Sequence, residues 1–170
     1  FICRGTEISN KDNLKNYITD TEAFDECWYL AKYKDIASAN IEPIDHYVKY
    51  GIHEGREPNA IFSPSAYAWV NSVPLPEAFT LWLSDRSNFS NILYLDGKPK
   101  KPTAKSVMMF AHLAGPELFG AEKSFLDCVQ MLAENDVNIY VVLPSALNEE
   151  YVKEVLKYAT KVFFLPICWW

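Results

Sequence analysis

Apolar positions recur with a helical period in the first part of the chain. Between residues 24 and 36 they stand three and four residues apart, which predicts one buried helix face. The residues on that face are Phe24, Cys27, Trp28, Leu30, Ala31 and Ile36. Thr21 precedes this helix as its expected N-cap. A second short helix is expected after Pro43, with Gly51 ending it as a left-handed cap. Two further short helices are expected within residues 64–86, divided by Pro74 and Pro76.

The pattern changes after residue 104 to continuous apolar runs separated by amphipathic stretches. The runs at 106–111, 137–143 and 162–165 predict strands, and the stretches 121–134 and 149–159 predict the helices between them. The first run has no polar interruption, so we expect that strand to be buried on both faces. Strands and helices in this order, joined by right-handed crossovers, predict a parallel, doubly wound sheet.

A change in composition marks the boundary between the two parts. Residues 97–103 contain a glycine, two prolines and three lysines, which are typical of a loop. We therefore divide the chain into a lead-in at 1–20, a helical module at 21–100 and an α/β part at 101–170. Segment 88–95 is short and apolar, and its secondary structure stays open. The terminal Trp169 and Trp170 look like a cut through a core, so we expect the chain to be part of a longer protein.

Composition and charge exclude several classes of protein. The 170 residues carry 16 Lys and Arg against 22 Asp and Glu, and a net charge of −6 does not favour binding to nucleic acid. No apolar run reaches the roughly 18 residues of a membrane-spanning helix. The four cysteines and three histidines form no pair at metal-ligand spacing. We therefore expect buried, reduced thiols in a cytoplasmic protein without a metal, and peripheral association of the parent protein with a membrane stays open.

One motif has its core at residues 24–62, and its polar and aromatic positions include Trp28, Tyr29, Asp35, His46, Tyr47, Glu54 and Arg56. This motif resembles a helical module found in bacterial polysaccharide-assembly glycosyltransferases. The simplest interpretation is a hydrogen-bonded turn in which Arg56 pairs with Asp35 or Glu54. An alternative is a carbohydrate-binding groove lined by the aromatic side chains Trp28, Tyr29, Tyr33 and Tyr47.

A second motif runs from Phe110 to His112 and from Gly120 to Leu126. It continues at 141–144 and 165–166 and ends with the terminal tryptophan pair. This motif is similar to the opening of the N-terminal half of a family 4 glycosyltransferase with GT-B architecture. The resemblance implies an α/β fold class, in which the all-α module is followed by a partial Rossmann-like, parallel three-strand β-α-β-α-β unit. It also implies transfer of a sugar from a nucleotide-sugar donor to a surface polysaccharide or a lipid-linked glycan. Because the donor-binding domain of such enzymes lies C-terminal, we expect these 170 residues alone to be inactive.

The loop at 112–120 is the expected ligand site, because it leaves the carboxyl end of a strand and begins a helix. Gly115 and Gly120 would let a phosphate approach the backbone closely. Contacts to the ligand are expected from residues at the start of the helix, namely Ala121, Lys123 and Ser124. The resemblance implies that Glu122 lies near the donor or the acceptor, although a carboxylate in the first helical turn is also favoured by the helix dipole. His112 could act as a base, form a hydrogen bond to an acceptor sugar, or only end the strand.

Other interpretations of the chain stay open. The loop lacks the spacing of the known phosphate-binding fingerprints, so it could be a tight turn without a ligand. Trp169 and Trp170 could stack on a sugar ring or pack in a core. The helical module could be a non-catalytic carbohydrate-binding or protein-interaction unit. A nucleotide-binding enzyme of another chemistry is the remaining alternative.

Overall fold

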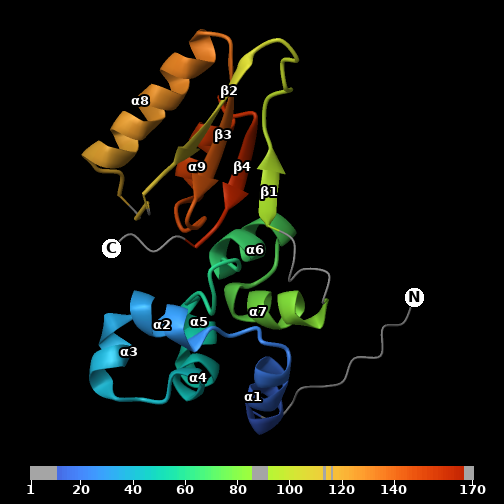
Figure 1. Cartoon of the computed structure of the whole chain (residues 1–170), viewed down its shortest axis with the longest axis vertical. Coiled ribbons are helices and arrows are strands. Elements are labelled where there is room, and N and C mark those ends of the chain that lie inside the picture. The colour runs from blue at the N-terminus through green and yellow to red at the C-terminus, as the bar shows by residue number, and fades with distance from the viewer. Residues whose placement is uncertain (1–10, 86–91, 113, 116, 167–170) are drawn as a thin grey trace.

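The computed structural model describes residues 11–85, 92–112, 114–115 and 117–166. These residues form two lobes, one above the other (Figure 1). We call residues 11–85 the helical lobe and residues 92–166 the sheet lobe. The chain is therefore a mixed α/β protein whose helices come first and whose sheet follows.

Short helices make up the helical lobe. They are α1 (Lys11–Asp20), α2 (Glu26–Lys32), α3 (Lys34–Ala39), α4 (Pro43–His46), the π-helical turn η1 (Tyr47–Gly51), α5 (Ile52–Glu54), α6 (Pro64–Asn71) and α7 (Leu75–Ser84). Their core is aromatic, and Phe62 stacks on Trp82 with ring centroids 4.5 Å apart. The segment 1–20 is more than a lead-in, because α1 places Ile18 in this core. Asp25, rather than Thr21, caps α2, since its carboxylate accepts the Trp28 N–H at 2.8 Å.

Gly51 does not end its helix, contrary to the prediction. Its φ of −57° is helical, and the chain continues through α5 to Gly55, which takes the left-handed conformation with φ +67°. A glycine is needed at position 51 instead because the packed rings around it leave no room for a side chain. A Cβ at this position would lie 2.7 Å from a ring carbon of Tyr47 and 2.9 Å from the Tyr29 hydroxyl. A local pattern identifies a glycine near a helix end, whereas the tertiary packing decides what that glycine does.

The sheet lobe contains β1 (Leu93–Asp96), β2 (Lys105–Phe110), α8 (Gly120–Glu134), β3 (Val137–Leu143), α9 (Glu149–Leu156) and β4 (Lys161–Phe164). The strand order is β1-β4-β3-β2. Strands β2, β3 and β4 run parallel, whereas β1 pairs antiparallel with β4. The sheet is thus four-stranded and mixed, not a three-stranded parallel sheet. The additional strand, β1, comes from the segment whose state the sequence left open.

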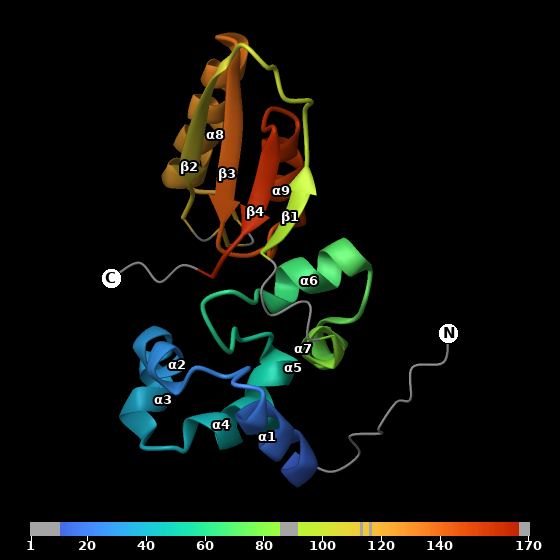
Figure 2. The same cartoon turned by 45° about the vertical axis from the view of Figure 1, so that its right-hand side comes forward.

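The two faces of the sheet differ sharply. Figure 2 shows α8 and α9 behind the sheet and no helix in front of it. Residues on the covered face, such as Val141, Val162 and Phe164, are fully buried. On the other face, Met108 and Phe110 of β2 are 54% and 51% exposed. The prediction that this strand is buried on both faces is therefore wrong, because β2 lies at the edge of the sheet and helices cover only one side.

The helical lobe meets the sheet lobe at the carboxyl ends of β3 and β4, where α6 lies against them (Figure 2). Ala66 of α6 belongs to the hydrophobic core of the sheet lobe. The Ser65 hydroxyl accepts the N–H of Ala146, which follows β3, at 3.1 Å. In open α/β sheets this edge is where ligands bind, so the helical lobe lies beside the edge of greatest functional interest.

Candidate functional site

The carboxyl ends of β2 and β3 lie side by side at one edge of the sheet. The last rung between them is the hydrogen bond from Ala111 N–H to Val142 C=O, at 3.0 Å. Beyond it, one loop leads from β2 to α8 and another leads from β3 to α9. The side chain of Asn148 joins the two loops, because its Nδ2 donates to Gly115 C=O at 2.9 Å. These two loops and the helix starts that follow them form the candidate site.

The first turn of α8 presents an open surface with one inward carboxylate. Ala121, Lys123 and Ser124 are exposed, whereas Glu122 is buried. Oε2 of Glu122 accepts the N–H of Phe119 at 3.0 Å. A glutamate at this position satisfies one of the backbone donors that a helix start leaves free. In this structure Glu122 thus holds the chain that enters α8, and Ala121, Lys123 and Ser124 remain accessible to a ligand.

Gly115 and Gly120 differ from the other described glycines in the open space around them. Neither has the positive φ of Gly55. A Cβ on Gly120 would meet no atom within 4 Å, and one on Gly115 would meet only a carbonyl oxygen at 4.0 Å. Gly97, by contrast, lies so close to Ala159 that a Cβ would be 2.2 Å from its carbonyl oxygen. The fold itself therefore does not require a glycine at 115 or 120.

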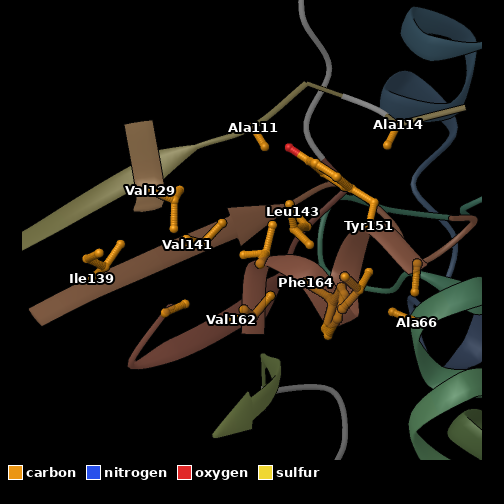
Figure 3. Close-up of a cluster of buried hydrophobic side chains, with 14 residues drawn as sticks. Ala66, Ala111, Ala114, Val129, Ile139, Val141, Leu143, Tyr151, Val162 and Phe164 are labelled. Atoms are coloured by element: carbon orange, nitrogen blue, oxygen red, sulfur yellow. The ribbon is translucent and has the colours of Figure 1, made fainter. Parts of the chain in front are cut away.

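Tyr151 contributes a buried hydroxyl to this edge. It lies on α9, and Figure 3 shows its ring extending so that the hydroxyl points toward Ala111 at the end of β2. The residue is 2% exposed, and its hydroxyl has no hydrogen-bond partner within the described part of the chain. Burial, followed by the charge of Glu122, raises the pKa of this hydroxyl to about 12, so it keeps its proton. A donor is therefore held beneath the loop that leads into α8.

Sequence analysis did not single out Tyr151 or Asn148. Asn148 could have been found, because its Oδ1 accepts the Tyr151 N–H at 2.9 Å in an ordinary N-cap three residues before it. Tyr151 matches the apolar face of an amphipathic helix, and only the tertiary structure shows where its hydroxyl lies. His112 is exposed at the end of β2. Trp169 and Trp170 lie outside the described residues.

The motif of the helical lobe is drawn together into a polar cluster around Tyr29. The Tyr29 hydroxyl lies 3.0 Å from Nδ1 of His46. Burial, and secondarily the charge of Arg56, lower the pKa of His46, so the ring favours its neutral form. Burial is also the main reason why the pKa of Tyr29 is raised, which keeps its hydroxyl protonated. The Tyr29 hydroxyl and Nδ1 of the neutral His46 ring therefore share one buried hydrogen bond.

Arg56 pairs with both of the carboxylates that the sequence indicated. Its Nη1 lies 2.9 Å from Asp35, and its Nε lies 2.6 Å from Glu54. The guanidinium also lies over the ring of Tyr33, at 4.8 Å from the centroid. The predicted pairing is confirmed. Its effect is to tie α3 to the end of α5, and both carboxylates remain exposed enough for water to screen them.

Further hydrogen bonds and an ion pair in the same lobe were not expected from the sequence. Buried Glu57 accepts a hydrogen bond from the Tyr33 hydroxyl and pairs with Lys32 at 3.2 Å. Asn59 accepts the N–H groups of Ile61 and Phe62, at 3.0 and 2.9 Å. These residues fix the turn that follows α5. The polar residues of the motif thus stabilise the helical lobe through contacts with one another.

The helical lobe has no groove lined by Trp28, Tyr29, Tyr33 and Tyr47. Tyr29 and Tyr47 are fully buried, and their rings meet edge to face with centroids 5.8 Å apart. Trp28 is half-buried, and the ammonium of Lys32 lies 4.9 Å from its ring centroid. The expected aromatic groove is therefore replaced by an aromatic core, because these side chains face one another rather than solvent.

Within the described ranges, no three His, Cys, Asp or Glu side chains are grouped so that they could hold a metal ion. Cys27 and Cys128 are free thiols, but they are exposed rather than buried as expected. None of the described helices has both the length and the apolar character needed to cross a membrane. Comparison with models of known protein families, with curated proteins and with solved structures gave no match.

Proposed function

We propose that the chain is part of a family 4-like glycosyltransferase of GT-B architecture, in which the sheet lobe is the beginning of a Rossmann-like domain. In this proposal a nucleotide sugar is the donor, and a surface polysaccharide or lipid-linked glycan is the acceptor. The work of the described edge is to add contacts to the donor phosphates while the sugar leaves, beside those of the donor-binding domain, which in such enzymes lies C-terminal. The compartment consistent with this donor is the cytoplasm, and the parent protein would reach lipid-linked acceptors from the membrane surface.

The buried hydroxyl of Tyr151 is the observation that carries the proposal. An unpaired hydroxyl in a protein interior costs free energy, so its retention calls for a partner. The hydroxyl is close enough to Glu122, in the first turn of the 15-residue helix α8, for that charge to raise its pKa. The free N–H groups and the dipole of a helix start favour an anion. A phosphate oxygen at this place would accept from both the helix start and the tyrosine. A nucleotide diphosphate fits because its leaving phosphate gains charge during transfer.

Gly115 and Gly120, where the fold does not require a glycine, support the same ligand. Since the fold requires no glycine at 115 or 120, the open space at both positions is available to a group from outside the chain. Lys123 and Ser124 add an ammonium and a hydroxyl on the accessible side of the helix. We assign to His112 the contact with the reacting sugar, and to Glu122, which caps α8, the positioning of the loop.

Removal of the Tyr151 hydroxyl tests the proposal. In Tyr151→Phe the unliganded protein should melt at an unchanged or higher temperature, because an unpaired buried hydroxyl is removed. Affinity for UDP or GDP should fall by about tenfold or more, since a hydrogen bond to a charged oxygen is lost. The measurement is a ¹⁵N NMR titration that follows the amides of Gly120, Ala121 and Glu122.

Tyr47→Phe is the matched control. Tyr47 also buries a hydroxyl with no partner in the described part of the chain, but it lies in the core of the helical lobe. Its loss should leave nucleotide affinity unchanged. The proposal fails if NAD shifts the α8 amides as strongly as UDP and GDP do. It also fails if neither nucleotide shifts them, or if Tyr151→Phe lowers the melting temperature and leaves affinity intact.

The helical lobe also has a role in this proposal. It places Ser65 and Ala66 against the carboxyl edge of the sheet, and its own polar motif is used in internal ties. We therefore assign it a scaffolding role toward that edge, in preference to carbohydrate binding through its motif aromatics.

A further inference from the structure

A groove lies where the helical lobe meets the sheet lobe. Its volume is about 430 Å³, within the range of small-molecule sites. Residues of α6 and of the chain leading into α7 form one wall, and residues between β3 and α9 form the other. The lining residues are Ser65, Ala68, Trp69, Ser72, Val73, Leu75, Ala146, Leu147 and Glu149.

We propose that this groove binds a saccharide, with Trp69 as its apolar platform and Glu149 as its main hydrogen-bond acceptor. The inference deepens the proposed function and takes its ligand class from it, because sugar transfer needs a place for a glycan near the phosphate site. It gives the helical lobe a direct part in binding, through α6 rather than through the motif around Tyr29.

The mixture of side chains in the groove matches the chemistry of a sugar. A pyranose has C–H groups on its faces and hydroxyls around its edge, so it needs an apolar platform next to hydrogen-bonding groups. Trp69 is partly exposed and provides an indole. Ser65 and Ser72 provide hydroxyls, and Glu149 provides a carboxylate. The grooves lined by Leu30 and Ile36, by Lys100 and Tyr140, and by Ala133 and Tyr158 have no tryptophan among their described lining residues.

The charge of the groove separates its ligand from the phosphate proposed for the α8 start. Among the described residues that line it, Glu149 is the only charged one. Its carboxylate is about half exposed, and its ion pair with Lys153 is long, at 3.9 Å. A carboxylate without a lining cation repels an anion, but it accepts hydrogen bonds from neutral hydroxyls. The groove is therefore suited to a neutral, hydroxyl-rich ligand.

The position of the groove relates it to the candidate phosphate site. Glu149 is the first residue of α9, directly after Asn148, whose side chain holds Gly115. Tyr151 lies in the same first turn of α9. One helix start therefore separates the saccharide groove from the loop that leads into α8, so a sugar in the groove would lie at the same edge of the sheet as the phosphate.

The test uses the whole chain labelled with 5-fluorotryptophan. The five tryptophans give five ¹⁹F signals, and Trp69→Phe identifies the signal of Trp69. The probes are methyl glycosides of glucose, galactose, mannose, rhamnose and N-acetylglucosamine, together with disaccharides of each. We expect at least one probe to shift the Trp69 signal in a saturable way.

Two variants and one control sharpen this test. Trp69→Phe, read by the ¹H signals of the sugar, should weaken binding roughly tenfold, the scale of one good aromatic contact. Glu149→Gln should weaken it several-fold, and it keeps the inference testable if Trp69→Phe does not fold. Trp28→Phe is the matched control, since Trp28 is a half-buried tryptophan outside the groove. It should leave binding unchanged.

The inference is overturned if no glycoside moves the Trp69 signal, or if Trp28→Phe weakens binding as much as Trp69→Phe does. A saccharide that shifts the Trp69 signal while UDP and GDP leave the α8 amides unmoved would support the groove and reject the phosphate site. The reverse pair of results would reject the groove alone.

Discussion

The helical lobe and the sheet lobe each bury a tyrosine hydroxyl that lacks a hydrogen-bond partner among the described residues, but the surroundings of the two hydroxyls differ. Tyr47 is enclosed by aromatic rings, with Phe79 edge-on at 5.0 Å. Burial, and then nearby Tyr29, raise its pKa, and the residue belongs to the hydrophobic core of its lobe. Tyr151 lies beneath the loop into α8, at the edge of a sheet. An unpaired buried hydroxyl thus indicates a ligand site only where open space and a favourable electrostatic field lie beside it.

The same contrast extends to the packing of the two lobes. Helices of the helical lobe surround one aromatic core from several sides, and its polar motif residues pair with one another. The sheet lobe is covered on one face, and on the other it exposes Met108 and Phe110. Its carboxyl edge carries glycines that its own fold does not need. The difference teaches that the helical lobe is organised for internal stability, whereas the sheet lobe keeps surfaces available.

The largest expected effect tests the difference between the two sheet faces. Phe164→Ala removes a fully buried ring from the covered face and should cost roughly 3–5 kcal/mol of unfolding free energy. Phe110→Ala, on the open face, should cost less than about 1 kcal/mol. Urea unfolding of both variants measures the difference. Equal losses would show that the second face is also covered in the folded chain.

A smaller effect is expected from the glycine that the helical lobe needs for space. Gly51→Ala places a methyl group against the buried rings of Tyr47 and Tyr29 and should cost roughly 1–3 kcal/mol through overpacking. Gly120→Ala is the control, because its Cβ meets nothing within 4 Å and alanine suits a helix start. Thermal unfolding of both variants compares them. A Gly51→Ala protein as stable as the parent would contradict the close packing around η1.

The smallest effect is a dependence on pH carried by His46. Because burial and Arg56 lower its folded-state pKa below the ordinary 6.5, the unfolded chain takes up the proton first as the pH falls. The contribution of neutral His46 is therefore complete above pH 6.5 and is lost as the pH falls through the folded-state pKa. Glu54 and Asp35 oppose this shift in part.

His46→Asn keeps an acceptor for Tyr29 but cannot titrate, so its stability should fall less steeply between about pH 7 and pH 5. Parallel urea unfolding series for the parent and the variant measure the two slopes. Identical slopes would mean that His46 is as easily protonated in the folded chain as in the unfolded one.

Local patterns predicted much of the fold because they record which side chains share a face. The apolar run at 137–143 matches β3, and the predicted helix at 121–134 matches α8 apart from its first residue. The pairing of Arg56 with Asp35 and Glu54 was also accessible, since Glu54 lies two residues away and both carboxylates carry the opposite charge. These features depend on residues that are near in sequence or of opposite charge.

Contacts between distant segments decided the rest. The amino-acid sequence by itself determined the main helices and strands of the sheet lobe, its parallel core and the pairing of Arg56, because periodicity and charge are local properties. Only the tertiary structure placed β1 antiparallel to β4 and left one face of β2 open. It also turned Gly51 from a helix cap into a packing glycine and brought the Tyr151 hydroxyl beneath the loop into α8. The physical reason is that a pattern of apolar residues indicates which face of a helix or strand becomes buried, whereas the packing of distant elements determines what covers that face.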